Sequence, residues 1–83
     1  MDDVIKSIEA RIYNARQRFG SFASTHEALG VAVEEWDEFR DAIRDNECDM
    51  VMLECIDLAC VLLRLHDQLA TSKALRERSG MEE

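Results

Sequence analysis

The sequence predicts an all-α fold of three helices, and three observations support this prediction. The chain has 83 residues with no proline and only three glycines, which excludes most turn-rich β architectures. Apolar residues recur at helical spacing in three segments, and short polar turns separate these segments. A chain of this length forms one domain with a thin core, so residues 1–83 are expected to be a single all-α domain.

The first two helices are expected over residues 3–18 and 26–45. Turn-forming residues at positions 20–24 separate them, and Ser24 or Thr25 can supply the N-cap of the second helix. In the second helix, an apolar seam with 3-4-3-4 spacing is expected to face the core of a helical bundle. The seam residues are Leu29, Ala32, Trp36, Phe39 and Ile43.

The third helix is expected over residues 47–70, antiparallel to the second, with Asn46 as its N-cap and a frayed tail over residues 72–83. From position 50 to 63 every residue is apolar except Glu54 and Asp57. A helix that is apolar nearly all round is buried nearly all round, and two other helices are too few to cover it. We therefore expect a homo-oligomer, a dimer or a dimer of dimers, with a four-helix-bundle core.

The charge of the chain excludes several partners. The net charge is −8 at pH 7, whereas nucleic acids and anionic membrane surfaces both require a cationic footprint. No apolar run reaches the roughly 20 residues that span a bilayer, and the N-terminal residues do not resemble a signal peptide. Three cysteines without a C-x-x-C pair favour a reducing compartment. We expect a cytoplasmic protein.

Acidic residues on the second and third helices are expected to converge. Glu38 and Glu54 are each eight residues from Asn46, and Glu35 and Asp57 are each eleven residues from it. If the turn centres on Asn46, these pairs lie at matching heights, ~12 and ~16 Å from the turn. Four carboxylates at short range repel one another, and a hard divalent cation such as Mg²⁺ or Mn²⁺ is the natural compensator. The alternative is an ordinary solvated acidic face, although Glu54 and Asp57 interrupt an otherwise apolar helix.

The acidic residues form two motifs that resemble a known family. These are Glu34-Glu35-Trp36-Asp37-Glu38 and, fifteen residues later, Glu54-Cys55-Ile56-Asp57. The pattern is similar to the signature of the MazG-like nucleoside triphosphate pyrophosphohydrolases, an all-α superfamily that includes dimeric dUTPases. The resemblance covers roughly residues 25–69. It implies Mg²⁺-dependent hydrolysis of the α–β bond of a nucleoside triphosphate, which yields the monophosphate and pyrophosphate.

The resemblance also implies roles for individual residues. Glu35, Glu38, Glu54 and Asp57 would hold the metal, and Glu34, with Glu38, would take part in catalysis by orienting or deprotonating the attacking water. The motif does not specify cations for the substrate phosphates.

Two residues outside the motifs are candidates for substrate binding. Arg64 lies seven residues after Asp57 on nearly the same helix face, and an ion pair at the bundle edge with Asp67 or another acidic residue is its alternative role. His26, at the start of the second helix, is the other candidate, with a capping or turn role as its alternative.

Two other functions compete with hydrolysis. The first is a non-catalytic helical interaction module, or a degenerate family member that binds nucleotide without turnover. The second is a di-iron carboxylate bundle, but that class uses Glu-x-x-His, and here Asp57 stands three residues after Glu54.

Overall fold

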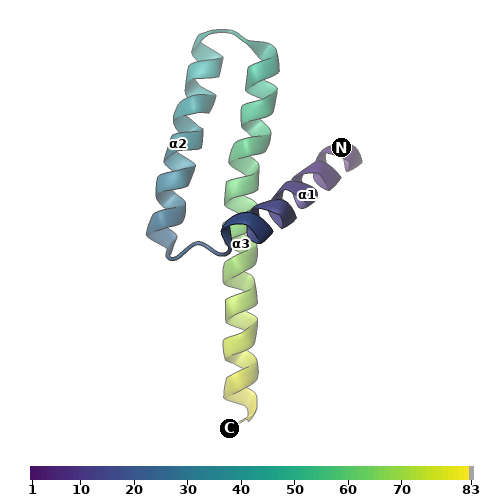
Figure 1. Ribbon diagram of the computed structural model, residues 1–83, viewed down its shortest axis with the longest axis vertical. Coiled ribbons are helices and arrows are strands. Elements are labelled where there is room, and N and C mark those ends of the chain that lie inside the picture. Colours follow the sequence, from purple (N-terminus) through teal and green to yellow (C-terminus); the bar gives the residue numbers. More distant parts are fainter. Residues whose placement is uncertain (83) are drawn as a thin grey trace.

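The computed structural model describes the backbone of residues 1–82 and the side chains of residues 1–77. Three helices follow one another, α1 (Asp2–Phe19), α2 (Thr25–Arg44) and α3 (Cys48–Glu82), and residues 1–82 contain no strand. The all-α prediction is therefore confirmed. Helix α2 runs antiparallel to the first half of α3, and α1 crosses α3 obliquely (Figure 1). The molecule is elongated, with extents of 56 × 29 × 20 Å.

The end of α3 differs from the expectation. The helix continues past residue 70, where the sequence predicted its end, and reaches Glu82. Good helix formers such as Lys73, Ala74 and Leu75 follow directly, with no proline and no glycine before Gly80. The residues expected to form a frayed tail are therefore helical through position 82, and Glu83 lies outside the described residues.

The turn between α2 and α3 fixes their register. Asn46 adopts a left-handed conformation with φ of 55°, and its amide donates to the Ile43 carbonyl at 3.1 Å. The amide of Glu47 donates to the Ala42 carbonyl at 3.3 Å, which completes a Schellman motif at the end of α2. The prediction that Asn46 caps α3 is therefore wrong, since α3 begins at Cys48 and Asn46 instead follows the C-cap residue of α2, Asp45. Asparagine suits this position because it tolerates left-handed backbone better than most residues.

The connection between α1 and α2 is fastened to α3. Phe22 is buried, and its backbone N–H and carbonyl both bond to the side-chain amide of Gln68, at 2.8 and 2.9 Å. Arg64 donates to the Gly20 carbonyl at 3.0 Å, and its guanidinium lies 4.0 Å from the centre of the Phe22 ring. The Ser24 hydroxyl accepts from the Glu27 amide at 3.1 Å, which confirms an N-cap at the predicted position. The contacts of Gln68 and Arg64 thus fix the connection between α1 and α2 to α3.

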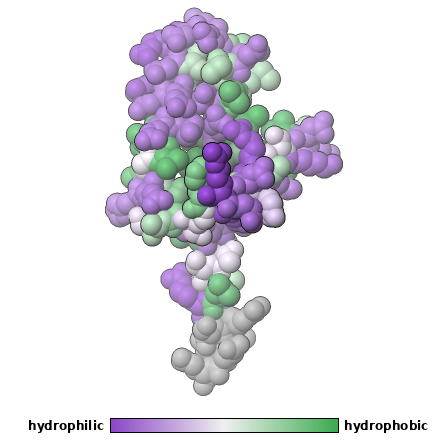
Figure 2. Space-filling view, in the orientation of Figure 1, coloured by the Kyte–Doolittle hydropathy of each residue, from purple (hydrophilic) through white to green (hydrophobic). Residues whose placement is uncertain are grey.

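The core of the single chain is small. Among the side chains of residues 1–77, those of Phe22, Ala28, Ala42 and Glu54 are buried. The predicted seam of α2 lies elsewhere, because Leu29 is 59% exposed and Trp36 is 49% exposed. The small side chains of Ala28 and Ala42 are buried where α2 packs against α3. The seam therefore faces largely outward: Leu29, Trp36 and Ile43 are exposed, and Ala32 and Phe39 are partly buried. Hydrophobic side chains accordingly appear on the molecular surface (Figure 2).

Candidate metal centre

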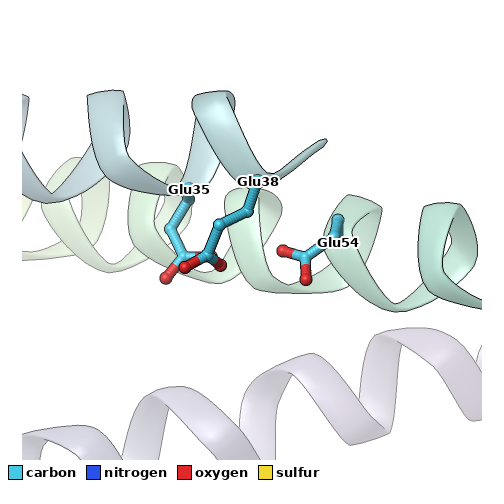
Figure 3. A group of neighbouring side chains, drawn as sticks. All are labelled: Glu35, Glu38 and Glu54. Atoms are coloured by element: carbon cyan, nitrogen blue, oxygen red, sulfur yellow. The ribbon is translucent and has the colours of Figure 1, made fainter. Parts of the chain in front are cut away.

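Three glutamates converge between α2 and α3. Glu35 and Glu38 lie one turn apart on α2, and Glu54 faces them from α3 (Figure 3). One carboxylate oxygen from each residue lies within 4.8 Å of the others. The structure thus brings together three of the four carboxylates that the hairpin register predicts will meet.

The carboxyl group of Glu54 is the least accessible of the cluster. Its residue is only 6% exposed, and its Oε2 atom is buried without a hydrogen-bond partner among the described residues. Burial raises the pKa of Glu54, and the negative charges of Asp57 and Glu38 raise this pKa further. An ionised carboxylate in this position is costly unless a positive charge compensates it.

Glu35 is partly buried and shares this environment. Burial and the neighbouring charge of Glu38, followed by those of Asp57 and Glu54, raise the pKa of Glu35 to about 6. A hydrogen bond between Glu35 and Glu38 acts in the same direction, because only a protonated carboxyl group can donate it. The Oε2 atom of Glu35 is also buried and has no partner within residues 1–77.

Asp57 lies at the edge of the cluster and has a positively charged partner. Arg11 of α1 forms an ion pair with the Asp57 carboxylate, and the Asp57 side chain is 20% exposed. Asp57 still acts on the glutamates, because its charge raises the pKa values of Glu35 and Glu54. The fourth predicted carboxylate is therefore close to the other three, but a guanidinium from α1 holds it.

A cavity of about 320 Å³ adjoins the cluster. Arg11, Glu35, Asp57 and Arg64 contribute its charged side chains. The remaining six lining residues are apolar and come from all three helices, namely Ile12, Ala15, Phe19, Val31, Cys60 and Val61. The cavity thus combines an apolar wall with two cations beside the carboxylates, which suits an organic anion that carries phosphate groups.

The other predicted site residues lie outside the three-glutamate cluster. Glu34 and His26 are exposed on α2, and their predicted roles in catalysis and substrate binding stay predictions. Arg64 lines the cavity but is engaged by the connection between α1 and α2. Its alternative partner Asp67 instead pairs with Arg16 of α1.

The donor set fits a hard divalent cation. Every candidate ligand is a carboxylate oxygen, and Mg²⁺ and Mn²⁺ prefer oxygen donors. Two of the oxygens, one on Glu35 and one on Glu54, are buried and unpartnered among the described side chains. A metal at this position would satisfy those oxygens and offset the repulsion that raises both pKa values.

Sequence reasoning missed Arg11. The residue directly precedes Ile12 in the apolar pattern of the first helix, which places a cation at the border of the packed face. That position is the only signal in the sequence, since the carboxylate it meets lies 46 residues away.

Comparisons with protein-family models, with curated proteins and with solved structures find no match to this chain. The resemblance to the MazG-like enzymes therefore depends on the two acidic motifs. Within residues 1–82, none of the three helices combines the length and apolar character needed to cross a membrane.

Proposed function

We propose that the protein is a Mg²⁺-dependent nucleoside triphosphate pyrophosphohydrolase of the MazG-like type. The observation that carries the proposal is the buried carboxyl group of Glu54, which lies beside Glu35 and Glu38 of α2 and has one oxygen without a partner among the described residues. A cluster of this kind is unfavourable in the metal-free protein and becomes favourable when a cation is bound. The adjoining cavity has room and charge for a phosphate-bearing ligand.

The chemistry follows from the side chains present. Glu35, Glu38, Glu54 and Asp57 would hold the cation, which supplies charge neutralisation for the triphosphate. A water oxygen bonds to the α-phosphorus, the bond from that phosphorus to the bridging oxygen breaks, and pyrophosphate leaves with that oxygen. The carboxylates of Glu34 and Glu38 are the candidates to orient the water and accept its proton.

The working unit in this proposal is a homodimer or a dimer of dimers. The outward seam of α2 and several large apolar residues of α3 are exposed in the single chain, including Met52 at 63%. Exposed apolar surface on this scale is typical of subunit interfaces. A second copy that packs its own α2 and α3 against this surface would build the four-helix core that one chain lacks.

Thermal melting tests the metal site directly. We expect millimolar Mg²⁺ to raise the melting temperature, and a non-hydrolysable triphosphate added with Mg²⁺ to raise it further. Glu38→Gln should remove the Mg²⁺ effect while the protein stays folded. Asp37→Asn is the matched control, because Asp37 lies on the same helix, is exposed and pairs with Arg40 at 3.1 Å.

A pyrophosphate-release assay across the ribo- and deoxyribonucleoside triphosphates then tests turnover. Release by the wild type and the control, but not by Glu38→Gln, is the expected result. Absence of any Mg²⁺ effect on melting contradicts the metal site and favours the non-catalytic interaction module. If Mg²⁺ and nucleotide both raise the melting temperature but no pyrophosphate is released, the protein is a degenerate family member that binds nucleotide without hydrolysing it.

A further inference from the structure

Two ion pairs connect α1 to α3 among the described side chains, and they lie in different surroundings. Arg16 pairs with Asp67, which is 54% exposed and lies away from the acidic cluster. Arg11 pairs with Asp57, which is 20% exposed and adjoins the cluster. Both arginine side chains are 41% exposed. The two pairs are therefore similar as tethers of α1, but only the Arg11 pair contacts a candidate metal ligand.

In the metal-free protein, Arg11 supplies the positive charge that partly compensates the acidic cluster. Its guanidinium neutralises the one carboxylate that stands apart from the three glutamates, and its charge opposes the rise in the pKa of Glu54. A divalent cation held by Asp57 and the glutamates would compete with Arg11 for the same carboxylate and repel the guanidinium. The released side chain would remain beside the cavity that it already lines.

We propose that Arg11 is the phosphate-binding residue of this site, and that Asp57 holds it until a divalent cation displaces it. The inference rests on the proposed function and names a phosphate-binding cation that the acidic motifs do not specify. A planar guanidinium suits the role because it can give two parallel hydrogen bonds to a phosphate group.

Arg64 is less suited to the same role. Its guanidinium donates to the Gly20 carbonyl at 3.0 Å and lies over the Phe22 ring, and its Nε atom is buried, with no partner among the described residues. Moving Arg64 toward a ligand would release the connection between α1 and α2. Moving Arg11 breaks a single ion pair that metal binding would break in any case.

The test compares Arg11→Met with Arg16→Met, which removes the parallel tether. Calorimetric titration with Mn²⁺ alone measures metal affinity without turnover. Titration with each of the four α,β-imido deoxynucleoside triphosphates in the presence of Mg²⁺ then measures nucleotide affinity. We expect Arg11→Met to bind Mn²⁺ about fivefold more tightly, because a competing positive charge is gone. The same variant should bind the tightest nucleotide at least about tenfold more weakly, because a charged hydrogen-bond donor is lost.

The opposite signs of the two effects distinguish this role from a structural one. If Arg11 only positioned Asp57, its loss would weaken the binding of both Mn²⁺ and nucleotide. Arg16→Met removes an ion pair away from the cluster and should leave both affinities within about twofold of the wild type. Unchanged Mn²⁺ affinity or unchanged nucleotide affinity in Arg11→Met overturns the assignment while leaving the metal site intact. A wild type that binds no Mn²⁺ overturns the metal site itself and the Arg11 assignment with it.

Discussion

At the scale of single residues, the carboxylates of the cluster balance two opposing demands. Metal binding requires them ionised, whereas burial and mutual repulsion favour their protonated forms. The hairpin register predicts that Glu35, Glu38 and Glu54 meet, and the structure places them together. The pairing of Asp57 with Arg11 could not be predicted, because it depends on how α1 crosses α3 rather than on spacing within the hairpin.

The pH dependence of stability follows from these raised pKa values. Because the pKa of Glu35 is about 6 in the folded protein and 4.5 in the reference state, this group favours folding below pH 4.5. That contribution is lost as the pH rises through 6, and Glu54 acts in the same direction. Urea unfolding of the metal-free protein should therefore show its stability falling between pH 4.5 and 7.

Glu35→Gln should make the profile less steep, and the part of the pH dependence that Glu54 contributes should remain. The stabilisation of the protein by Mg²⁺ should show the reverse trend. It should be larger at pH 7 than at pH 5, because Mg²⁺ binds the ionised carboxylates. A wild-type profile that rises with pH over this range would contradict the assignment.

The buried carboxyl group of Glu54 gives a second prediction. Glu54→Gln keeps the shape of the side chain and removes a charge that two or more neighbouring carboxylates repel. We expect the free energy of unfolding of the metal-free protein to increase by about 1 kcal/mol or more. Chemical denaturation with and without Mg²⁺ measures both this gain and the loss of metal stabilisation. A variant that is less stable without metal would show that the ionised group is already well compensated.

At the scale of the helices, the sequence predicts each element but not each boundary. Apolar spacing is sufficient to locate three helices, and the turn-forming residues separate them correctly. The far end of α3 differs from the prediction, because polarity suggests fraying where helix propensity still favours helix. The predicted role of Asn46 is also wrong, because asparagine is common both before a helix and after one.

The left-handed conformation of Asn46 gives a test of the turn. Asn46→Ala should lower the free energy of unfolding by about 1 kcal/mol, because alanine is strained at a φ of 55°. Asn46→Gly is the matched control and should be neutral or slightly stabilising, since glycine adopts this conformation freely. Equilibrium denaturation measures both variants. Equal losses in the two would indicate that the asparagine side chain, and not the backbone conformation, matters here.

At the scale of the whole molecule, one chain leaves much of its apolar surface uncovered. The sequence correctly indicates that a single chain has too few helices to cover α3, as exposed Leu62 and Leu63 show. It does not indicate which of two neighbouring apolar stripes on α2 faces α3, because both follow the helical period. The alanines at positions 28 and 42 take the inner place, and the larger residues of the seam lie outside.

The outward seam predicts where subunits would meet. Trp36 and Phe39 form an aromatic pair with ring centres 5.7 Å apart, and aromatic residues are enriched at the centres of interfaces. Trp36→Glu should raise the dissociation constant of the homodimer at least about tenfold, as measured by sedimentation equilibrium. Asp41→Lys, an exposed change on the opposite side of the same helix, should leave it nearly unchanged. If both variants remain dimeric, the interface lies on another face.

The placement of the carboxylates in one hairpin has a consequence for the order of folding. All three glutamates lie between positions 35 and 54, whereas Arg11 reaches its partner across 46 residues. Contacts close in sequence form early, so repulsion among the glutamates should raise the free energy of the folding transition state. The Arg11 ion pair should form after this transition state. Stopped-flow measurements at fixed protein concentration should show Glu54→Gln refolding faster and Arg11→Met mainly unfolding faster. A divalent cation, on this account, would accelerate folding as well as stabilise its product.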